Sequence, residues 1–395
     1  MLNDVPDGWK PTTVGQVASL NDDSLSSKTS KDYEFSYVSI DNVSTGSING
    51  WASQTFAQAP SRARRIVKQG DILLSTVRPY LKAFARVNEK YEDLVVSTGF
   101  AVLRAGADIN ENFLYQLIFS ESFIEHLKGL MTGSNYPAVK PADIASFKFV
   151  LPPLNEQHRI AEILSSVDAS IQATQAVIEQ AERVKHGLME RLLTGGLGSE
   201  AIERGEVPEG WCLHAPISNY IKNKTQKWNG YEVLPYIGLE HIEKGSGRLL
   251  GFGESGDITS SKNVFEEGDV LFGKLRPNLR KYWRANKRGI CSTDILILRS
   301  QKEMLNEYLF IIVQSELFLA FAENDAAGTK MPRTSWKRLE TIELPLPPLK
   351  EQKRIAEIIL SFDELIGQQM LIAEKQTRTK RGLMDDLLTG KVRTV

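Results

Sequence analysis

One stretch decides the fold of this chain: Leu151-Pro152-Pro153-Leu154-Asn155-Glu156-Gln157-His158-Arg159-Ile160-Ala161-Glu162-Ile163-Leu164. It returns 195 residues later as Leu346-Pro347-Pro348-Leu349-Lys350-Glu351-Gln352-Lys353-Arg354-Ile355-Ala356-Glu357-Ile358-Ile359, with three positions changed. At the same offset, Gly187-Leu188-Met189-Glu190-Arg191-Leu192-Leu193-Thr194-Gly195 matches Gly382-Leu383-Met384-Asp385-Asp386-Leu387-Leu388-Thr389-Gly390. The chain therefore carries two related segments of equal length, one central and one C-terminal.

Each repeated segment predicts a long helix. The helix must begin after the two prolines, because proline cannot lie inside a helix. Apolar residues then recur at an approximate heptad spacing, which Thr174 and Lys185 interrupt, and Gly195 and Gly390 favour termination. About 38 residues at ~1.5 Å each would give a rod of roughly 57 Å.

The two predicted helices are expected to pair with each other. A helix with one apolar stripe needs a partner, and the chain supplies a second helix with the same pattern. Two related halves packed around a pseudo-two-fold axis would make this pair an antiparallel coiled coil. The alternative is a helical linker buried against its own domain, but linkers rarely need such detailed repetition.

The repeat extends over two whole halves of the chain. Val5-Pro6-Asp7-Gly8-Trp9 returns as Val207-Pro208-Glu209-Gly210-Trp211, and Gly70-Asp71-Ile72-Leu73-Leu74 returns as Gly268-Asp269-Val270-Leu271-Phe272. Strands are expected at 35–40, 72–77, 95–103 and 147–151, and at 234–239, 270–275, 290–298 and 341–344. Helical spacing covers 111–130 and 301–322. Strands followed by helices without regular alternation indicate an α+β unit, present twice with diverged surfaces.

Composition narrows the class of protein. The chain has 395 residues, enough for two or three domains, and 42% hydrophobic content is ordinary for a globular protein. No apolar run approaches the ~18 residues of a membrane helix, and the N-terminus lacks a signal peptide, so we expect a cytoplasmic protein. Two cysteines are too few for a disulfide framework or a cysteine-based zinc site.

The sequence carries no enzyme signature. A phosphate-binding loop and a dinucleotide-binding fingerprint are both absent, and the five histidines show no metal-ligand spacing. The Pro-Pro element is flanked by Leu, and not by the polar and aromatic residues that adenine methyltransferases place there. Asp71 and Asp269 follow glycines in predicted turns, where Asp favours backbone hydrogen bonds. We therefore expect no catalytic, cofactor-binding or metal-binding residue in this chain.

Basic residues gather at equivalent places in both halves, although the net charge is only −1. Residues 270–293 contain no acidic residue. Among them are Lys274, Arg276, Arg280, Lys281 and further cations around Tyr282 and Trp283. Arg78 and Lys82 belong to a weaker cluster in the first half. Basic residues interleaved with aromatic ones suit phosphate contact with base stacking or packing. A solvated strand face is the alternative, but the duplication favours DNA binding.

These residues resemble one known family, the specificity (S) subunits of type I restriction-modification systems. The resemblance rests on the doubled Leu-Pro-Pro-Leu-x-Glu-Gln-x-Arg-Ile-Ala-Glu-Ile, the paired Gly-Leu-Met…Leu-Leu-Thr-Gly helix ends and the Gly-Asp-Ile/Val-Leu strand starts, and it covers the whole chain. It implies target recognition domain 1 at 1–150, a central conserved helical region at 151–196, target recognition domain 2 at 197–345 and a C-terminal conserved helical region at 346–395.

The resemblance also implies a function in anti-phage defence without catalysis. Each recognition domain would read one half of a bipartite double-stranded DNA site, and the paired helices would set the spacer between the halves. Two modification (M) subunits would dock on this chain and methylate adenine with S-adenosylmethionine. Restriction (R) subunits would add ATP-driven translocation and cleavage, with ATP and Mg on those subunits. No membrane partner is implied.

Candidate DNA-binding residues follow from the basic clusters and the glycine loops after the predicted helices. For phosphate contact we predict Arg78, Lys82, Lys274, Arg276, Arg280 and Lys281. For base or groove contact we predict Ser134, Asn135, Tyr136, Thr329, Lys330 and Arg333. The alternative is that the loops at Gly133 and Gly328 are plain turns. Two other functions remain open: a coiled-coil protein-interaction scaffold with two globular binding arms, and a fused methyltransferase or nuclease.

Overall fold

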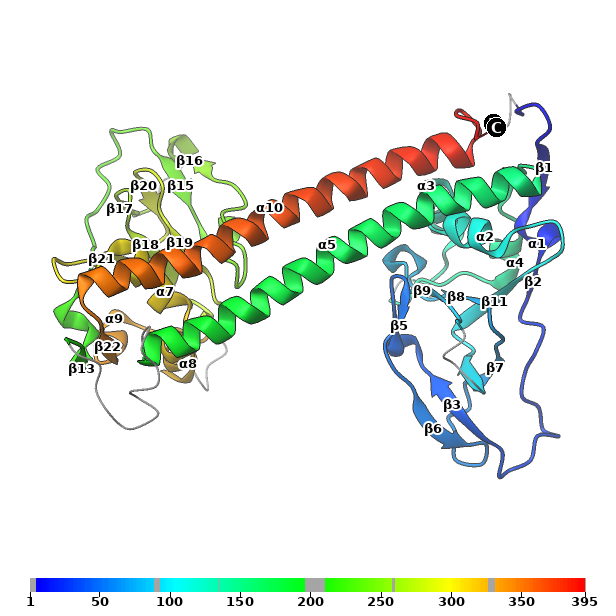
Figure 1. Ribbon diagram of the computed structural model, residues 1–395, viewed down its shortest axis with the longest axis horizontal. Helices are drawn as coiled ribbons and strands as arrows, with labels where there is room; N and C mark the ends of the chain where they lie inside the picture. The colour runs from blue at the N-terminus through cyan, green and yellow to red at the C-terminus, as the bar shows by residue number, and fades with distance from the viewer. Residues whose placement is uncertain are drawn as a thin grey trace. The chain divides into compact units, whose positions relative to one another are not determined.

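The computed structural model describes residues 5–88, 93–133, 135–195, 210–257, 260–325 and 331–394. The chain divides into two compact units (Figure 1). Unit 1 comprises Met1–Gln175 and Leu371–Val395, and unit 2 comprises Ala176–Met370. The long helices α5, Leu154–Gly195, and α10, Leu349–Leu388, each contribute one half to each unit. The predicted domain boundaries instead fall just before the two Pro-Pro elements and after Gly196, and they stay a prediction.

Unit 1 contains two four-stranded sheets and a small two-stranded pair that closes the domain. The first sheet has the order β2 (Ala18–Leu20), β11 (Phe100–Ala105), β8 (Ile72–Ser75), β9 (Phe84–Arg86). The second has the order β6 (Ala52–Thr55), β3 (Glu34–Val38), β10 (Leu94–Ser97), β7 (Ala63–Ile66), with β3 and β10 parallel. The two-stranded pair joins β1 (Lys10–Thr13) to β12 (Lys148–Leu151), and β4 (Val43–Ser44) forms a hairpin with β5 (Ser47–Ile48). The helices are α1 (Val14–Val17), α2 (Glu111–Ile118), α3 (Glu121–Leu130) and α4 (Pro141–Ala145), with short turns η1 (Ile40–Asn42) and η2 (Pro79–Leu81).

Unit 2 repeats this topology. Its first sheet has the order β14 (Ile221–Asn223), β21 (Ile295–Ser300), β18 (Val270–Gly273), β19 (Tyr282–Arg284). Its second has the order β16 (Gly253–Glu254), β15 (Pro235–Ile237), β20 (Gly289–Cys291), β17 (Asn263–Phe265). The strand β13 (Cys212–Pro216) pairs with β22 (Glu343–Leu346), and the helices are α7 (Asn306–Gln314), α8 (Glu316–Asp325) and α9 (Trp336–Leu339). Short turns are η4 (Ile217–Asn219), η5 (Leu239–His241), η6 (Ser255–Asp257) and η7 (Pro277–Leu279). The predicted α+β fold and its internal duplication are confirmed.

Two predicted elements in each half are divided in the structure. The expected strand at 95–103 is two strands, β10 and β11, in different sheets. The expected helix at 111–130 ends after α2, because Ser120 starts a new helix by accepting a hydrogen bond from the Phe123 amide at 3.3 Å. Ser315 does the same for the Phe318 amide at 3.4 Å between α7 and α8. A single capping hydroxyl thus interrupted an otherwise helical apolar pattern.

The long helices run antiparallel within each unit, as predicted. In unit 1, Asp168 contacts Lys380 and Thr174 contacts Gln376, so the partner number falls as the α5 number rises. Figure 1 shows this arrangement, with the start of α5 beside the red end of α10. In unit 2, Lys185 contacts Asp363. Of the helices that the structure describes, none is long and apolar enough to cross a membrane.

The helix pair is most deeply buried where it meets the globular part of each unit. Ile160 and Leu164 belong to the core of unit 1, together with apolar residues of α2 and α3. Ile355 and Ile359 occupy the same position in the core of unit 2, against α7 and α8. Ile171, which lies farther along α5, is only half-buried. Each domain therefore supplies much of the surface that covers the apolar stripe.

Candidate nucleic-acid interface

The repeated Glu-Gln pair anchors each long helix to its domain. The amide of Gln157 donates to the carbonyl oxygens of Asp108 at 3.0 Å and Pro152 at 2.8 Å, and its oxygen accepts from the Asn110 amide at 2.7 Å. Gln352 makes the same three contacts at equivalent positions in unit 2, at 2.8, 2.9 and 2.9 Å. Both glutamines are buried. The repeated sequence is thus a docking element of the framework.

The neighbouring glutamates explain why the Val-Pro-x-Gly-Trp segment is repeated. The Trp9 indole donates to Glu156 at 2.9 Å, and Trp211 donates to Glu351 at the same distance. In unit 1, the guanidinium of Arg393 also binds Glu156, at 2.8 and 2.9 Å, and holds the pKa of that carboxylate below its ordinary value of 4.5. The beginning and end of unit 1 therefore meet at the start of α5.

The Gly-Asp turns hold an arginine from the central strand of each first sheet. Asp71 binds Arg104 in a bidentate pair at 2.8 and 2.7 Å, and Asp269 binds Arg299 at 2.6 Å through both nitrogens. The same carboxylates accept backbone amides within their turns, at 2.8 Å in both cases, as the sequence predicted. These aspartates fix the strand that leads to the basic turn of each unit.

The basic turns have a strained backbone. Arg78 and Lys82 flank η2 with φ of 49° and 52°, and Arg276 and Arg280 flank η7 with φ of 52° and 49°. Left-handed conformations of this kind cost a non-glycine residue about 1 kcal/mol or more each. Strain of this kind persists where surrounding structure imposes it and is concentrated at functional sites. In both units a backbone hydrogen bond joins this turn to the glycine loop that follows in the chain. The amide of Arg78 donates to the Pro137 carbonyl at 2.8 Å, and the amide of Arg276 donates to the Pro332 carbonyl at 2.7 Å.

In unit 1 three predicted DNA-binding residues come together. The exposed guanidinium of Arg78 donates to the Asn135 carbonyl at 3.1 Å and lies 5.3 Å from the centre of the Tyr136 ring. Tyr136 is 73% exposed. A cation over an exposed aromatic ring on a rigid turn is suited to nucleic acid contact. Ser134 lies outside the described residues.

In unit 2 the equivalent turn gathers Lys274, Arg276 and Arg333. Leu275 forms a bridge with Arg333, and the Thr334 amide donates to the Lys274 carbonyl at 3.0 Å. Arg276 and Arg333 are exposed, and Arg333 also forms an ion pair with Asp294 at 3.4 Å. Thr329 and Lys330 lie outside the described residues. The association of the basic turn with the glycine loop is therefore present in both units.

Three other predicted phosphate contacts have internal partners. The Lys82 amine donates to the Phe119 carbonyl at 3.2 Å, and burial lowers the pKa of Lys82. The Lys281 amine donates to the Leu239 carbonyl at 2.6 Å. Arg280 binds two carboxylates of α8, Glu316 at 3.0 Å and Glu323 at 2.8 Å. Their contact with DNA stays a prediction, but these cations already stabilise the turns.

The aromatic residues among the basic ones pack inside the protein. Tyr282 and Trp283 are 4% and 7% exposed, so they belong to the core and offer no face to a base. Exposed aromatics occur elsewhere, at Trp51 and Phe252, each immediately before the first residue of an edge strand, β6 or β16. Lys287 lies 4.0 Å from the centre of the Phe252 ring. Sequence reasoning missed these candidate DNA contacts, because the exposure of an aromatic residue depends on what packs over it.

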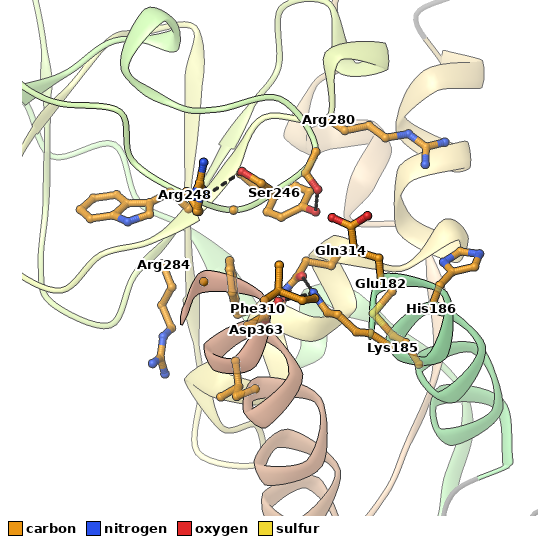
Figure 2. A pocket seen from close by; sticks show the side chains of 18 of the residues that line it. Glu182, Lys185, His186, Ser246, Arg248, Arg280, Arg284, Phe310, Gln314 and Asp363 are labelled. Atoms are coloured by element: carbon orange, nitrogen blue, oxygen red, sulfur yellow. Dashed lines mark hydrogen bonds and ion pairs between the residues drawn. The ribbon is translucent and has the colours of Figure 1, made fainter. Parts of the chain in front are cut away.

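A pocket of about 500 Å³ in unit 2 lies between the long helices and the domain (Figure 2). Four of the cations that line it have carboxylate partners: Lys185 with Asp363, Arg248 with Glu243, Arg280 with Glu316 and Arg284 with Glu307. Within the described residues, no group of three His, Cys, Asp or Glu side chains could hold a metal ion. The chemistry offered by the described surface is recognition through cations, amides and aromatic rings.

Comparison with known proteins shows which family and fold this chain is similar to. A family model described as "Type I restriction modification DNA specificity domain" matches residues 6–183 and 215–373. The type I restriction enzyme MjaVIII specificity subunit of Methanocaldococcus jannaschii is 29% identical over 313 residues, which cover 71% of this chain and 69% of that protein. The type I restriction enzyme EcoDI specificity subunit of Escherichia coli is 24% identical, over 93% of this chain and 84% of that protein. The crystal structure of a type I restriction-modification S subunit from M. genitalium shares the fold, with a TM-score of 0.62 and 14% identity over 98% of this chain and 97% of that one.

Proposed function

The chain belongs to the family of type I restriction-modification DNA specificity subunits, and we propose that each of its two units reads one half of a bipartite DNA site. Members of the family supply sequence recognition and are non-catalytic components of the restriction-modification complex. The observation that supports the proposal is the strained basic turn beside a glycine loop, present at the same place in two units of diverged sequence.

The two basic turns have the features that DNA contact requires. Arg78 and Arg276 are exposed, and their backbone is held in one conformation by the hydrogen bond to the glycine loop. A guanidinium presented on a rigid turn loses little freedom on binding a phosphate or a guanine edge. The loop residues beside them, Asn135 and Tyr136 in unit 1 and Arg333 in unit 2, differ between the units. Different loops on one framework would read different half-sites, which gives an asymmetric target.

We further propose that the paired helices set the spacer between the half-sites and that two M subunits dock on the repeated surface. Large apolar side chains are exposed along both helices, including Val177 at 45%, Leu349 at 44% and Leu371 at 59%. Exposed apolar residues on a repeated framework could receive two identical partners. Methyl transfer from S-adenosylmethionine would reside on the M subunits, and ATP and Mg would be used by the R subunits. The complex would act in the cytoplasm, where its DNA substrate lies.

The test is DNA binding by the complex of this chain with its M subunits, measured as a function of salt. Arg78→Glu and Arg276→Glu should each weaken binding at least about tenfold and lower the slope of log affinity against log salt by about 1. Lys148→Glu is the control, because Lys148 is exposed on β12, outside both basic turns and both long helices. Unchanged affinity in both turn variants would refute the assignment of these turns.

The alternative function, a scaffold whose two arms bind only proteins, predicts a different result. The complex would then bind a bipartite site no better than unrelated DNA of the same length. Methylome sequencing of a host that carries this chain and its M partner would identify both half-sites and their spacing. The absence of any methylated bipartite motif would reject the proposed function.

A further inference from the structure

Two ion pairs between the long helices are related by the internal repeat. In unit 2, the amine of Lys185 on α5 binds Asp363 on α10 at 2.5 Å. In unit 1, the amine of Lys380 on α10 binds Asp168 on α5 at 2.6 Å. Lys185 and Lys380 are equivalent residues of the repeat, 195 positions apart, as are Asp168 and Asp363. The lysine thus comes from α5 in one unit and from α10 in the other.

Each ion pair also contacts a buried glutamine of the domain. Lys185 donates to Gln314 of α7 at 2.7 Å, and Figure 2 shows its side chain directed at both Gln314 and Asp363. In unit 1, Gln116 of α2 donates to Asp168 at 2.9 Å. The two glutamines are 5% and 1% exposed. Each cluster therefore joins three elements: both long helices and the first helix of the domain that covers them.

The ion pairs are partly shielded from water. The side chains of Lys185 and Lys380 are 14% and 16% exposed, those of Asp363 and Asp168 are 29% and 31% exposed, and burial raises the pKa of Asp363. Separating such a pair leaves a partly buried charge without its partner, which costs more than the pair itself contributes. A neighbouring polar contact between the long helices of unit 1, from Thr174 to Gln376, is not repeated in the sequence. The residue equivalent to Thr174 is Gln369, and the residue equivalent to Gln376 is Ala181, which has no polar side chain. The Lys–Asp ion pair between the helices is therefore present in both units, whereas the neighbouring polar pair is not.

Alternative pairings of the helices separate these charges. A slip of one heptad would place Lys185 opposite Met370 and Asp168 opposite Leu387. Parallel pairing of the equivalent segments would instead oppose lysine with lysine and aspartate with aspartate. Both alternatives leave charges uncompensated, whereas an apolar stripe alone would tolerate a slip because its residues are interchangeable. The charges thus distinguish one register from its neighbours.

We propose that the Lys185–Asp363 and Lys380–Asp168 clusters are register locks that fix each recognition domain at one position on the helix pair and so restrict the complex to one spacer length. This inference rests on the proposed function, in which the helix pair sets the spacer. The four charged residues are positioning residues and need not contact DNA. The buried glutamines Gln314 and Gln116 transmit the register to the domains.

The experiment measures methyl transfer by the complete M–S complex on DNAs whose half-sites are separated by the native spacer, by one base pair less and by one base pair more. Lys185→Asp alone should reduce the preference for the native spacer at least about tenfold, the size expected for coupled charges. The exchanged pair, Lys185→Asp with Asp363→Lys, should restore the preference to within about threefold of the unmodified complex. Lys148→Glu, at an exposed position of β12 outside the helix pair, should leave it unchanged.

An apolar replacement separates positioning from stability. Lys185→Met with Asp363→Leu removes both charges, and such exchanges are often neutral or stabilising. This variant should remain folded, with an unchanged or raised melting temperature. Like Lys185→Asp, it should methylate the DNAs with altered spacers and so lose the preference for the native spacer. Retention of the native preference by the folded apolar variant, or an equal loss of methylation on all three DNAs, would overturn the proposal. An unmodified complex that methylates no bipartite site would instead overturn the proposed function, and this inference with it.

Discussion

The buried glutamine of the repeated motif allows a quantitative test of how the long helix is held. Gln157→Ala removes three hydrogen bonds to backbone groups of Asp108, Asn110 and Pro152. A hydrogen bond contributes roughly 1 kcal/mol net, and its loss leaves the buried backbone partner unsatisfied. The free energy of unfolding should therefore fall by about 3 kcal/mol. Gln157→Glu should destabilise further, because a carboxylate oxygen would replace the amide nitrogen 2.8 and 3.0 Å from two carbonyl oxygens.

The assay is urea unfolding followed by tryptophan fluorescence, which reports on Trp9 beside the same helix start. Gln352→Ala provides the equivalent change in unit 2 and should have a similar cost. Gln172→Ala, at an exposed position of α5, should change the stability by no more than about 0.5 kcal/mol. A loss below about 1 kcal/mol in Gln157→Ala, or a loss equal to that of the Gln172 control, would refute the docking role of the repeated glutamine.

Three further predictions concern the framework. Ile160→Ala should lower the free energy of unfolding by about 3 kcal/mol, because Ile160 is fully buried. Ile171→Ala should lower it by only about 1 kcal/mol, because Ile171 is half-buried. Equal losses in chemical denaturation would contradict this difference in burial. Arg393 lowers the pKa of Glu156, so this pair stabilises the protein above pH 4.5 and the stabilisation is lost as the pH falls through the lowered pKa. Arg393→Met should therefore show a smaller fall in melting temperature between neutral pH and about pH 3, and an unaltered pH profile would count against the pair. Inserting seven residues at matched positions of α5 and α10 should lengthen the preferred spacer by about 3 base pairs, since ~10 Å of helix spans that length of duplex, and retention of the original spacer would show that the helices do not set it.

Local patterns in the sequence were sufficient for the framework. Pro152-Pro153 and the heptad spacing placed the start of α5, because the chemistry of proline and the helical period act over a few residues. Exact repetition at one offset then implied two equivalent units and the pairing of their helices. A local interaction also made one prediction wrong. The expected single helix at 111–130 is two helices, because the Ser120 hydroxyl caps α3 and separates it from α2.

The roles of the charged residues could not be predicted in this way. Arg280 lies in a basic run, but its partners Glu316 and Glu323 are 36 and 43 positions away, and only the fold brings them together. Lys185 looked like an interruption of the heptad pattern, and its partner Asp363 is 178 positions away. Whether such a charge can also reach DNA depends on its exposure and on the internal partners that the fold gives it.

The sequence by itself determined that this protein is a duplicated α+β framework on two long helices, because repetition, proline positions and apolar periodicity are written along the chain. The tertiary structure alone decided which cations remain exposed on the basic turns, Arg78 and Arg276 among them, and which are used internally. The physical reason is distance along the chain. Backbone conformation depends mainly on near neighbours, whereas the burial and pairing of a charge depend on residues that approach only after folding.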